Sequence, residues 1–123
     1  VEVGDRIVTP SAELLANVTM QSGEGRFRWL HVPKGALDEV AAVAAAEVGH
    51  LAWVVTRDQM LDEEWFGPSM APAVRSRLGD LALVASERVS FYDPADSGPF
   101  ELVCRHGSLT SAEVNVPLLA ASA

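Results

Sequence analysis

The sequence has one cysteine, one lysine and no long uninterrupted apolar segment. A single cysteine, Cys104, excludes a disulfide bond within the chain. The apolar runs fall well short of the roughly 20 residues that cross a bilayer, so we expect no membrane partner. The nine basic residues are scattered and are outnumbered by seventeen acidic ones, for a formal net charge of −8. Because nucleic-acid binding needs clustered cations, we expect no nucleic-acid partner.

What the chain does contain is typical of a folded domain. Hydrophobic residues make up 49% of its 123 residues and charged residues 21%, which is enough apolar surface for a buried core. The chain starts at Val1, without an initiator methionine or a signal-like segment, and we therefore interpret it as a piece of a longer protein. The compartment stays open, although the lack of paired cysteines fits the cytoplasm.

The first half of the chain predicts a small α/β layer. Residues 17–20 and 26–32 alternate in type around Gly23-Glu24-Gly25, a pattern that favours two antiparallel strands. Residues 35–39 are expected to open a helix that ends at Gly49, because apolar residues from Leu37 to Val48 recur at spacings of three and four. A β-branched and aromatic run then predicts a buried strand at 51–56. Strand, strand, helix, strand is an order in which the alanine-rich helix lies on the sheet.

We expect a boundary between two structural units near residue 75. Residues 58–64 predict a short acidic helix, and residues 65–75 contain two prolines and little periodicity, which is typical of an irregular connection. The chain is therefore divided into residues 1–75 and residues 76–123.

The second unit is expected to consist mainly of strands. Residues 81–85 and 88–92 predict a β-hairpin around Ser86-Glu87, and residues 100–104 predict a further apolar strand. Cys104 would then be a small buried hydrophobic residue of that strand.

Two arginines, Arg26 and Arg28, alternate with Phe27 and Trp29 along the second strand. They could in principle hold an anion. A half-buried strand with a solvated basic face explains the same pattern, and we prefer that interpretation.

The histidines offer few candidates for chemistry. His31, His50 and His106 are far apart in the sequence, and none belongs to a metal-binding signature. His31 is expected on a strand and His50 just after a helix, and for both we prefer a structural or surface role.

His106 has a different setting. It follows an apolar strand and precedes Gly107, and Thr110 and Glu113 have the spacing of a capping box for a short helix. Side chains at strand ends of open α/β sheets commonly line active crevices. The alternative is that His106 is only a turn residue.

Five motifs occur in order along the chain, and their order and spacing agree with one family over nearly the whole sequence. They are Gly23-Glu24-Gly25-Arg26-Phe27-Arg28, Ala52-Trp53-Val54-Val55-Thr56-Arg57, Trp65-Phe66-Gly67-Pro68, Arg77-Leu78-Gly79-Asp80, and His106-Gly107-Ser108-Leu109-Thr110 with Glu113 and Pro117-Leu118-Leu119. The chain resembles the C-terminal part of type I phosphodiesterase/nucleotide pyrophosphatase-like members of the alkaline phosphatase superfamily, as found in actinobacteria.

This resemblance implies a hydrolase that uses two zinc ions and a Thr or Ser nucleophile. The last metal ligand of such enzymes is a His in a His-Gly motif, which matches His106. The resemblance places the other ligands and the nucleophile upstream, with an Asp-His-Gly motif shortly before Val1. Residues 1–75 would be a small cap-like layer, and residues 76–123 the closing strands of an alkaline-phosphatase-like sheet.

Two hypotheses follow. In the first, the chain is the C-terminal portion of a zinc-dependent hydrolase of phosphodiester or nucleotide pyrophosphate bonds. Its partners would be the missing N-terminal part of the same protein and a small phosphodiester or nucleotide substrate. The chain alone would be inactive and would hold no zinc tightly, because one His falls short of the roughly three protein ligands that a catalytic zinc needs. In the second, the chain is a non-catalytic acidic α/β interaction module.

Overall fold

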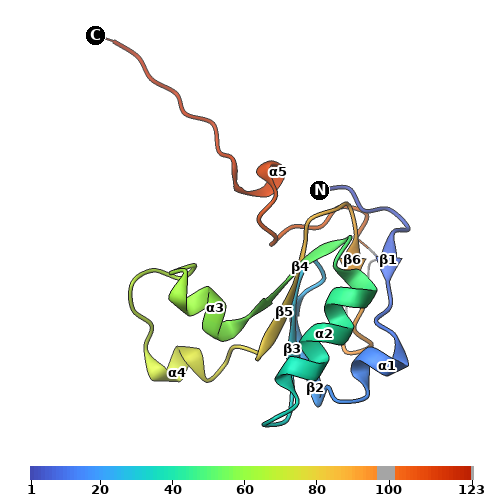
Figure 1. Cartoon of the computed structure of the whole chain (residues 1–123). Coiled ribbons are helices and arrows are strands. Elements are labelled where there is room, and N and C mark those ends of the chain that lie inside the picture. The colour runs from blue at the N-terminus through green and yellow to red at the C-terminus, as the bar shows by residue number, and fades with distance from the viewer. Residues whose placement is uncertain (97–101, 123) are drawn as a thin grey trace.

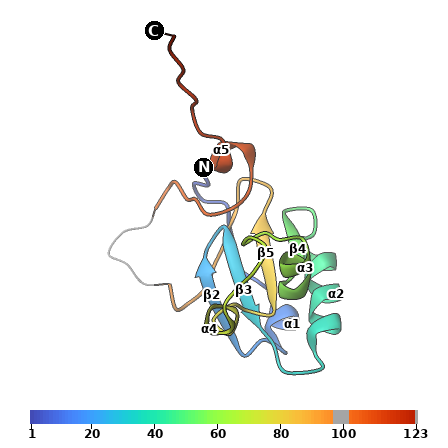
Figure 2. The ribbon, with the colours of Figure 1, turned by 90° about the vertical axis from the view of Figure 1, so that its left-hand side faces the viewer.

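A computed structural model describes residues 1–96 and 102–122 and shows a mixed α/β fold, as predicted. A four-stranded antiparallel sheet lies between helices on its two faces (Figures 1 and 2). Its strands are β2 (Met20–Glu24), β3 (Phe27–His31), β4 (Ala52–Thr56) and β5 (Leu81–Ala85), in the spatial order β2-β3-β5-β4. The order strand, strand, helix, strand expected for the first half is confirmed.

The hairpin of β2 and β3 closes tightly, with Glu24 opposite Phe27. The first strand starts at Met20 and continues through Gly23, later than the sequence pattern suggested. Gly23 adopts a φ of +82°, and a Cβ there would collide with the carbonyl oxygen of Phe27. Glycine is therefore required inside this strand, at a point where the two backbones approach closely.

Helix α2 (Leu37–Val48) covers one face of the sheet beside β4, as the 3.6-residue periodicity predicted. Its buried stripe consists of Val40, Ala44 and Val48. They join a core formed with Leu30, Leu81 and Leu83. Two acidic residues in the first turn interact favourably with the helix dipole.

Strand β5 decides the architecture. It lies between β3 and β4, and all five of its residues are buried. Because residues 81–85 complete the same sheet as the first half of the chain, the expected boundary at residue 75 does not separate two cores. Alternate residues of β5 point to opposite faces, so that Leu83 joins the core under α2 and Val84 joins a second core.

The hairpin expected from residues 81–85 and 88–92 is wrong. Strand β6 (Ser90–Phe91) pairs in parallel with β1 (Ile7–Val8) in a separate two-stranded sheet. Both sides of β5 are already occupied by β3 and β4, so no ladder position is left for the next segment of the chain.

The second core lies on the opposite face, under α3 (Arg57–Asp62). Here Met60 packs with Trp29, Val55 and Val84. The helix starts directly after β4, because the Thr56 hydroxyl accepts a hydrogen bond from the Gln59 N–H at 3.1 Å. The predicted acidic helix is thus confirmed, with bounds shifted to 57–62.

The remaining helices are single turns: α1 (Ala12–Leu15), α4 (Pro72–Arg75) and α5 (Ser111–Val114). After α5 the chain extends away from the body of the molecule (Figure 1). Leu118 and Leu119 in this extension are 91% and 93% exposed. Among the described residues, no helix is long and apolar enough to cross a membrane.

Candidate functional site around His106

The segment before His106 pairs with the N-terminus of the chain. The Val1 ammonium donates a hydrogen bond to the Arg105 carbonyl at 2.7 Å, and the Arg105 N–H donates to the Val1 carbonyl at 2.8 Å. Glu2 and Cys104 face each other in an antiparallel bridge. The segments 1–3 and 103–105 run in opposite directions, so Val1 lies opposite Arg105, the residue just before His106. His106 therefore lies next to the N-terminal end.

This pairing corrects one expectation about the strand at 100–104. Its first residues, 100 and 101, lie outside the described part of the chain. Cys104 is exposed, not buried, and Leu102 and Val103 are 56% and 57% exposed. Within the described residues, the segment 102–104 pairs with the N-terminal residues in a narrow ladder and does not join the four-stranded sheet, in line with the exposure of its side chains.

Arg26 is fully buried, so the expected solvated basic face is wrong. Its Nε and Nη2 donate to the two carboxylate oxygens of Glu113 at 2.5 and 2.9 Å, and its Nη1 donates to the carbonyls of Glu87 and Val89. A buried guanidinium is tolerated because it is paired with a carboxylate and fully hydrogen-bonded. Arg26 thus connects the turn between β2 and β3 to the turn before β6 and to helix α5.

Glu113 organises the loop that follows His106. Besides Arg26, it accepts hydrogen bonds from the Ser108 N–H at 3.2 Å, the Thr110 N–H at 3.3 Å and the Thr110 hydroxyl. Burial alone would raise its pKa, but the hydrogen bonds from Arg26, Thr110 and Ser108 lower it to about 2. The predicted capping pair of Thr110 and Glu113 is confirmed.

Ser108 fixes the same loop from its other side. The side chain is buried, and its hydroxyl donates a short hydrogen bond to the Ala85 carbonyl at the end of β5. Gly107 adopts a φ of +107°, a conformation that favours glycine, and lies close to Glu24. The His-Gly turn is therefore held between β2, β5 and α5.

Arg28 anchors the loop after β6 in the way that Arg26 anchors helix α5. It is fully buried and donates to both carboxylate oxygens of Asp96 and to the Phe91 carbonyl. Asp93 lies 3.7 Å from the same guanidinium. The acidic partners of the two arginines lie 87 and 68 residues away in the sequence, so alternation along one strand contained no signal that could have identified them.

The structure does not bring the three histidines together. His106 is exposed, and His50 is exposed beyond the end of α2. His31 Nε2 lies 2.7 Å from the Ser22 hydroxyl, a cross-strand pair in the hairpin, and so has the structural role that the sequence favoured. In residues 1–96 and 102–122 no three His, Cys, Asp or Glu side chains are placed to hold a metal ion. These residues alone do not fit a zinc site, and His106 provides at most one ligand.

The chain matches no protein-family model and no curated protein.

Proposed function

We propose that this chain is the C-terminal portion of a longer zinc-dependent hydrolase of phosphodiester or nucleotide pyrophosphate bonds, to which His106 contributes one metal ligand. The observation that supports this most is the ladder between Val1 and Arg105. Any residues that precede Val1 in a longer chain would continue along the strand that runs beside His106-Gly107. The resemblance to the alkaline phosphatase superfamily expects an Asp-His-Gly motif in that place.

The rigidity of the turn also supports the proposal. Metal ligands need to be held in place by their surroundings, because small displacements weaken metal binding. The His106 turn is held by the buried Ser108 hydroxyl and by Glu113, which is itself paired with Arg26. An exposed imidazole on such a turn can be presented to a second segment without first ordering the loop.

The number of zinc ligands decides what this chain and the N-terminal part would each contribute. A catalytic zinc needs about three protein ligands, so the proposed site requires side chains from the N-terminal part of the same protein. The chain on its own would then be inactive. Its role is to present the His106 imidazole from a fixed turn, and the substrate would be a small phosphodiester or nucleotide.

The test compares the longer protein with its His106→Ala and His50→Ala variants. We expect His106→Ala to lose zinc, measured by plasma emission spectroscopy, and to lose hydrolysis of a chromogenic phosphodiester. His50→Ala should retain both, because His50 is exposed just after α2 and belongs neither to the ladder with Val1 nor to the hydrogen bonds that hold the His106 turn. Full zinc content and full activity in His106→Ala would show that the assignment of His106 is wrong.

A second candidate function is a non-catalytic interaction module, favoured by the open edges of the sheet. Within residues 1–96 and 102–122, strands β2 and β4 each pair with a neighbour on one side only, and unpaired edges recruit partner strands. Size-exclusion chromatography with light scattering separates the two proposals. A stable complex with the N-terminal part that takes up zinc supports the hydrolase, whereas a chain that stays monomeric and binds no zinc when the N-terminal part is added supports the module.

A further inference from the structure

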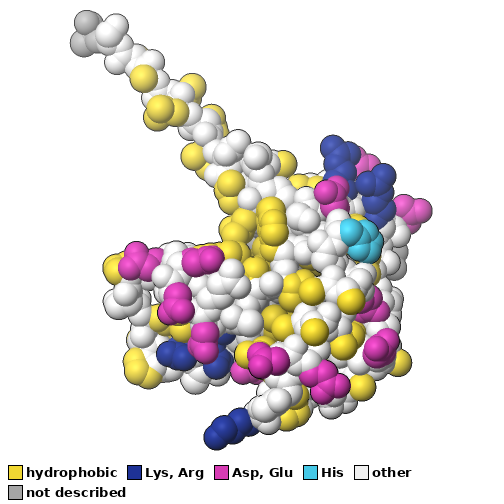
Figure 3. Space-filling model, in the orientation of Figure 1, with side chains coloured by type: hydrophobic (Ala, Val, Ile, Leu, Met, Phe, Trp, Pro, Cys, Tyr) yellow, Lys and Arg dark blue, Asp and Glu magenta, His cyan; other side chains and the backbone are white. Residues whose placement is uncertain are grey.

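Helices α1 and α2 carry acidic residues and no basic residue, so the face that they form has an excess of negative charge. Residues 7–25 and 35–56 contain no lysine or arginine. The acidic residues of the two helices are Glu13, Asp38, Glu39 and Glu47. In Figure 3 apolar side chains lie over α2 between acidic ones, and basic groups lie toward the margins of the view. Of the basic residues that flank these two ranges in the sequence, Arg26 is buried and paired with Glu113 and Arg57 lies 3.6 Å from Asp80, whereas Arg6 and Lys34 are exposed.

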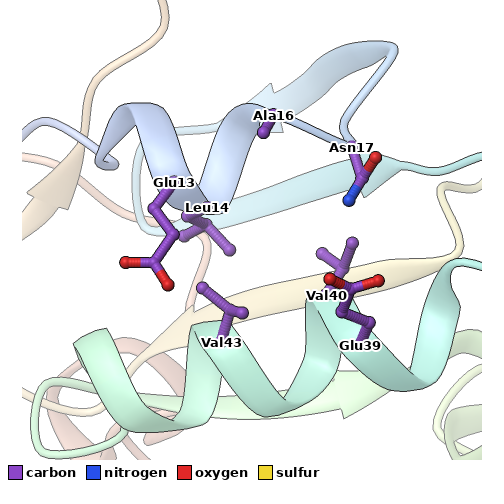
Figure 4. A pocket seen from close by; sticks show the side chains of 7 residues that line it. All are labelled: Glu13, Leu14, Ala16, Asn17, Glu39, Val40 and Val43. Carbon is purple, nitrogen blue, oxygen red and sulfur yellow. The ribbon is translucent and has the colours of Figure 1, made fainter.

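A groove runs between these two helices (Figure 4). Its first part has a volume of about 180 Å³ and is lined by Glu13 and Asn17 on the α1 side and by Glu39, Val40 and Val43 on the α2 side. A second part of about 460 Å³ continues along α2 past Ala42 and Ala46 to Glu47. Both parts include Glu13 and Val43, so the groove is continuous.

The carboxylates at its edges are free to bind. Glu13 and Glu39 are exposed, and within the described part of the chain neither side chain takes part in a hydrogen bond or an ion pair. Glu47 is only weakly engaged, because the Ser11 N–H donates to it at 3.4 Å. An occupant that matches this groove must combine positive charge with apolar surface. Arginine and lysine side chains do so, since their methylene stems cover apolar surface while their charged ends stay at the rim.

We propose that the groove between α1 and α2 binds a basic segment of a partner protein. One arginine or lysine stem lies against Val40 and Val43, and its charged end lies between Glu13 and Glu39. At about 180 Å³ the first part of the groove has room for one side chain, and the second part of about 460 Å³ leaves room for the residues next to it in the same segment. Binding of this kind is steered by charge and weakens as salt is added.

The proposal is tested with the whole chain and a defined probe. The probe is an amidated helical peptide with leucine on one face and arginine on the other, and the matched probe has glutamine in place of arginine. Backbone amide NMR shifts report where each peptide binds, and calorimetry reports its affinity. The variants are Glu13→Gln/Glu39→Gln and a control of equal charge, Asp62→Asn/Glu64→Gln, whose positions lie at the end of α3 on the opposite face of the sheet.

We expect the arginine peptide to shift amides of residues 13–17 and 39–47, and the groove variant to bind it about fivefold more weakly, since each exposed ion pair contributes modestly. The control variant and the glutamine peptide distinguish binding in the groove from general attraction of a basic peptide to a chain with a net charge of −8. The proposal is overturned if both variants bind the arginine peptide equally more weakly, or if the peptide shifts amides outside the two helices. It is also overturned if Mg²⁺ or Zn²⁺ alone produces the same shifts. Concentration-dependent shifts of these amides without peptide would overturn it too, because they would identify a second copy as the occupant.

Discussion

Replacing Glu113 by Gln should remove a pH-dependent contribution to stability whose size follows from its surroundings. The Glu113 side chain is 4% exposed and is bonded to Arg26, Thr110 and Ser108. Its pKa falls from 4.5 to about 2 in the folded chain. A shift of about 2.5 units at 1.36 kcal/mol per unit corresponds to roughly 3 kcal/mol.

The sign of the effect follows from the direction of the shift. A lowered folded-state pKa means that the carboxylate stabilises the fold fully above pH 4.5, and that this stabilisation is lost as the pH falls toward 2. The difference in free energy of unfolding between the wild type and Glu113→Gln, called the gap below, should therefore be constant near neutral pH. It should narrow by roughly 3 kcal/mol between pH 5 and pH 2.

Urea unfolding followed by tryptophan fluorescence measures this gap, because Trp29 is buried and reports on the core. Taking the difference between two chains cancels the titration of the other carboxylates. Asp62→Asn is the matched control, since Asp62 is exposed at the end of α3, and its gap to the wild type should stay small at every pH. A wild-type to Glu113→Gln gap that does not change between pH 5 and pH 2 would refute the reasoning.

Two further predictions concern packing in the sheet and are checked by urea denaturation. Leu83→Ala should lower the free energy of unfolding by about 2–5 kcal/mol, because Leu83 is fully buried in the central strand. Leu119→Ala, at a side chain 93% exposed, should change it by less than about 0.5 kcal/mol. Gly25→Ala should destabilise by about 1–3 kcal/mol, since the new methyl collides with the Ser90 hydroxyl oxygen. Adding Ser90→Ala should restore part of that loss, because the Cβ of residue 90 lies at 3.4 Å, and no recovery would mean that the strain arises elsewhere.

The predictions that the structure confirms rest on short-range patterns. Helix 37–48 was predictable because one turn of helix brings apolar residues into register without help from the rest of the chain. The pairing of Thr110 with Glu113 is likewise determined within a few residues, and so is the presence of a turn between the first two strands, although the turn lies at residues 25–26 and not at residues 23–25. Each of these patterns specifies a local geometry whose hydrogen bonds close inside the segment.

The errors all concern partners that are distant in the sequence. An apolar run such as 81–85 indicates a buried strand but does not indicate its neighbours, so the sequence favours a hairpin with the next segment and not the observed place between β3 and β4. The side-chain pattern of Arg26 and Arg28 is compatible with exposure or with burial. The two guanidinium groups can be buried because the fold places Glu113 next to Arg26 and Asp96 next to Arg28.

For the candidate site, the sequence by itself singled out the His106-Gly107 turn and the short capped helix that follows it, because glycine and capping residues act on their own backbone. Tertiary structure decided what surrounds that turn. It placed Val1 beside Arg105, paired Glu113 with the buried Arg26, and joined both halves of the chain in one sheet through β5. These contacts depend on burial and on charge pairing between segments far apart in the sequence, and such energies exist only once the chain has folded.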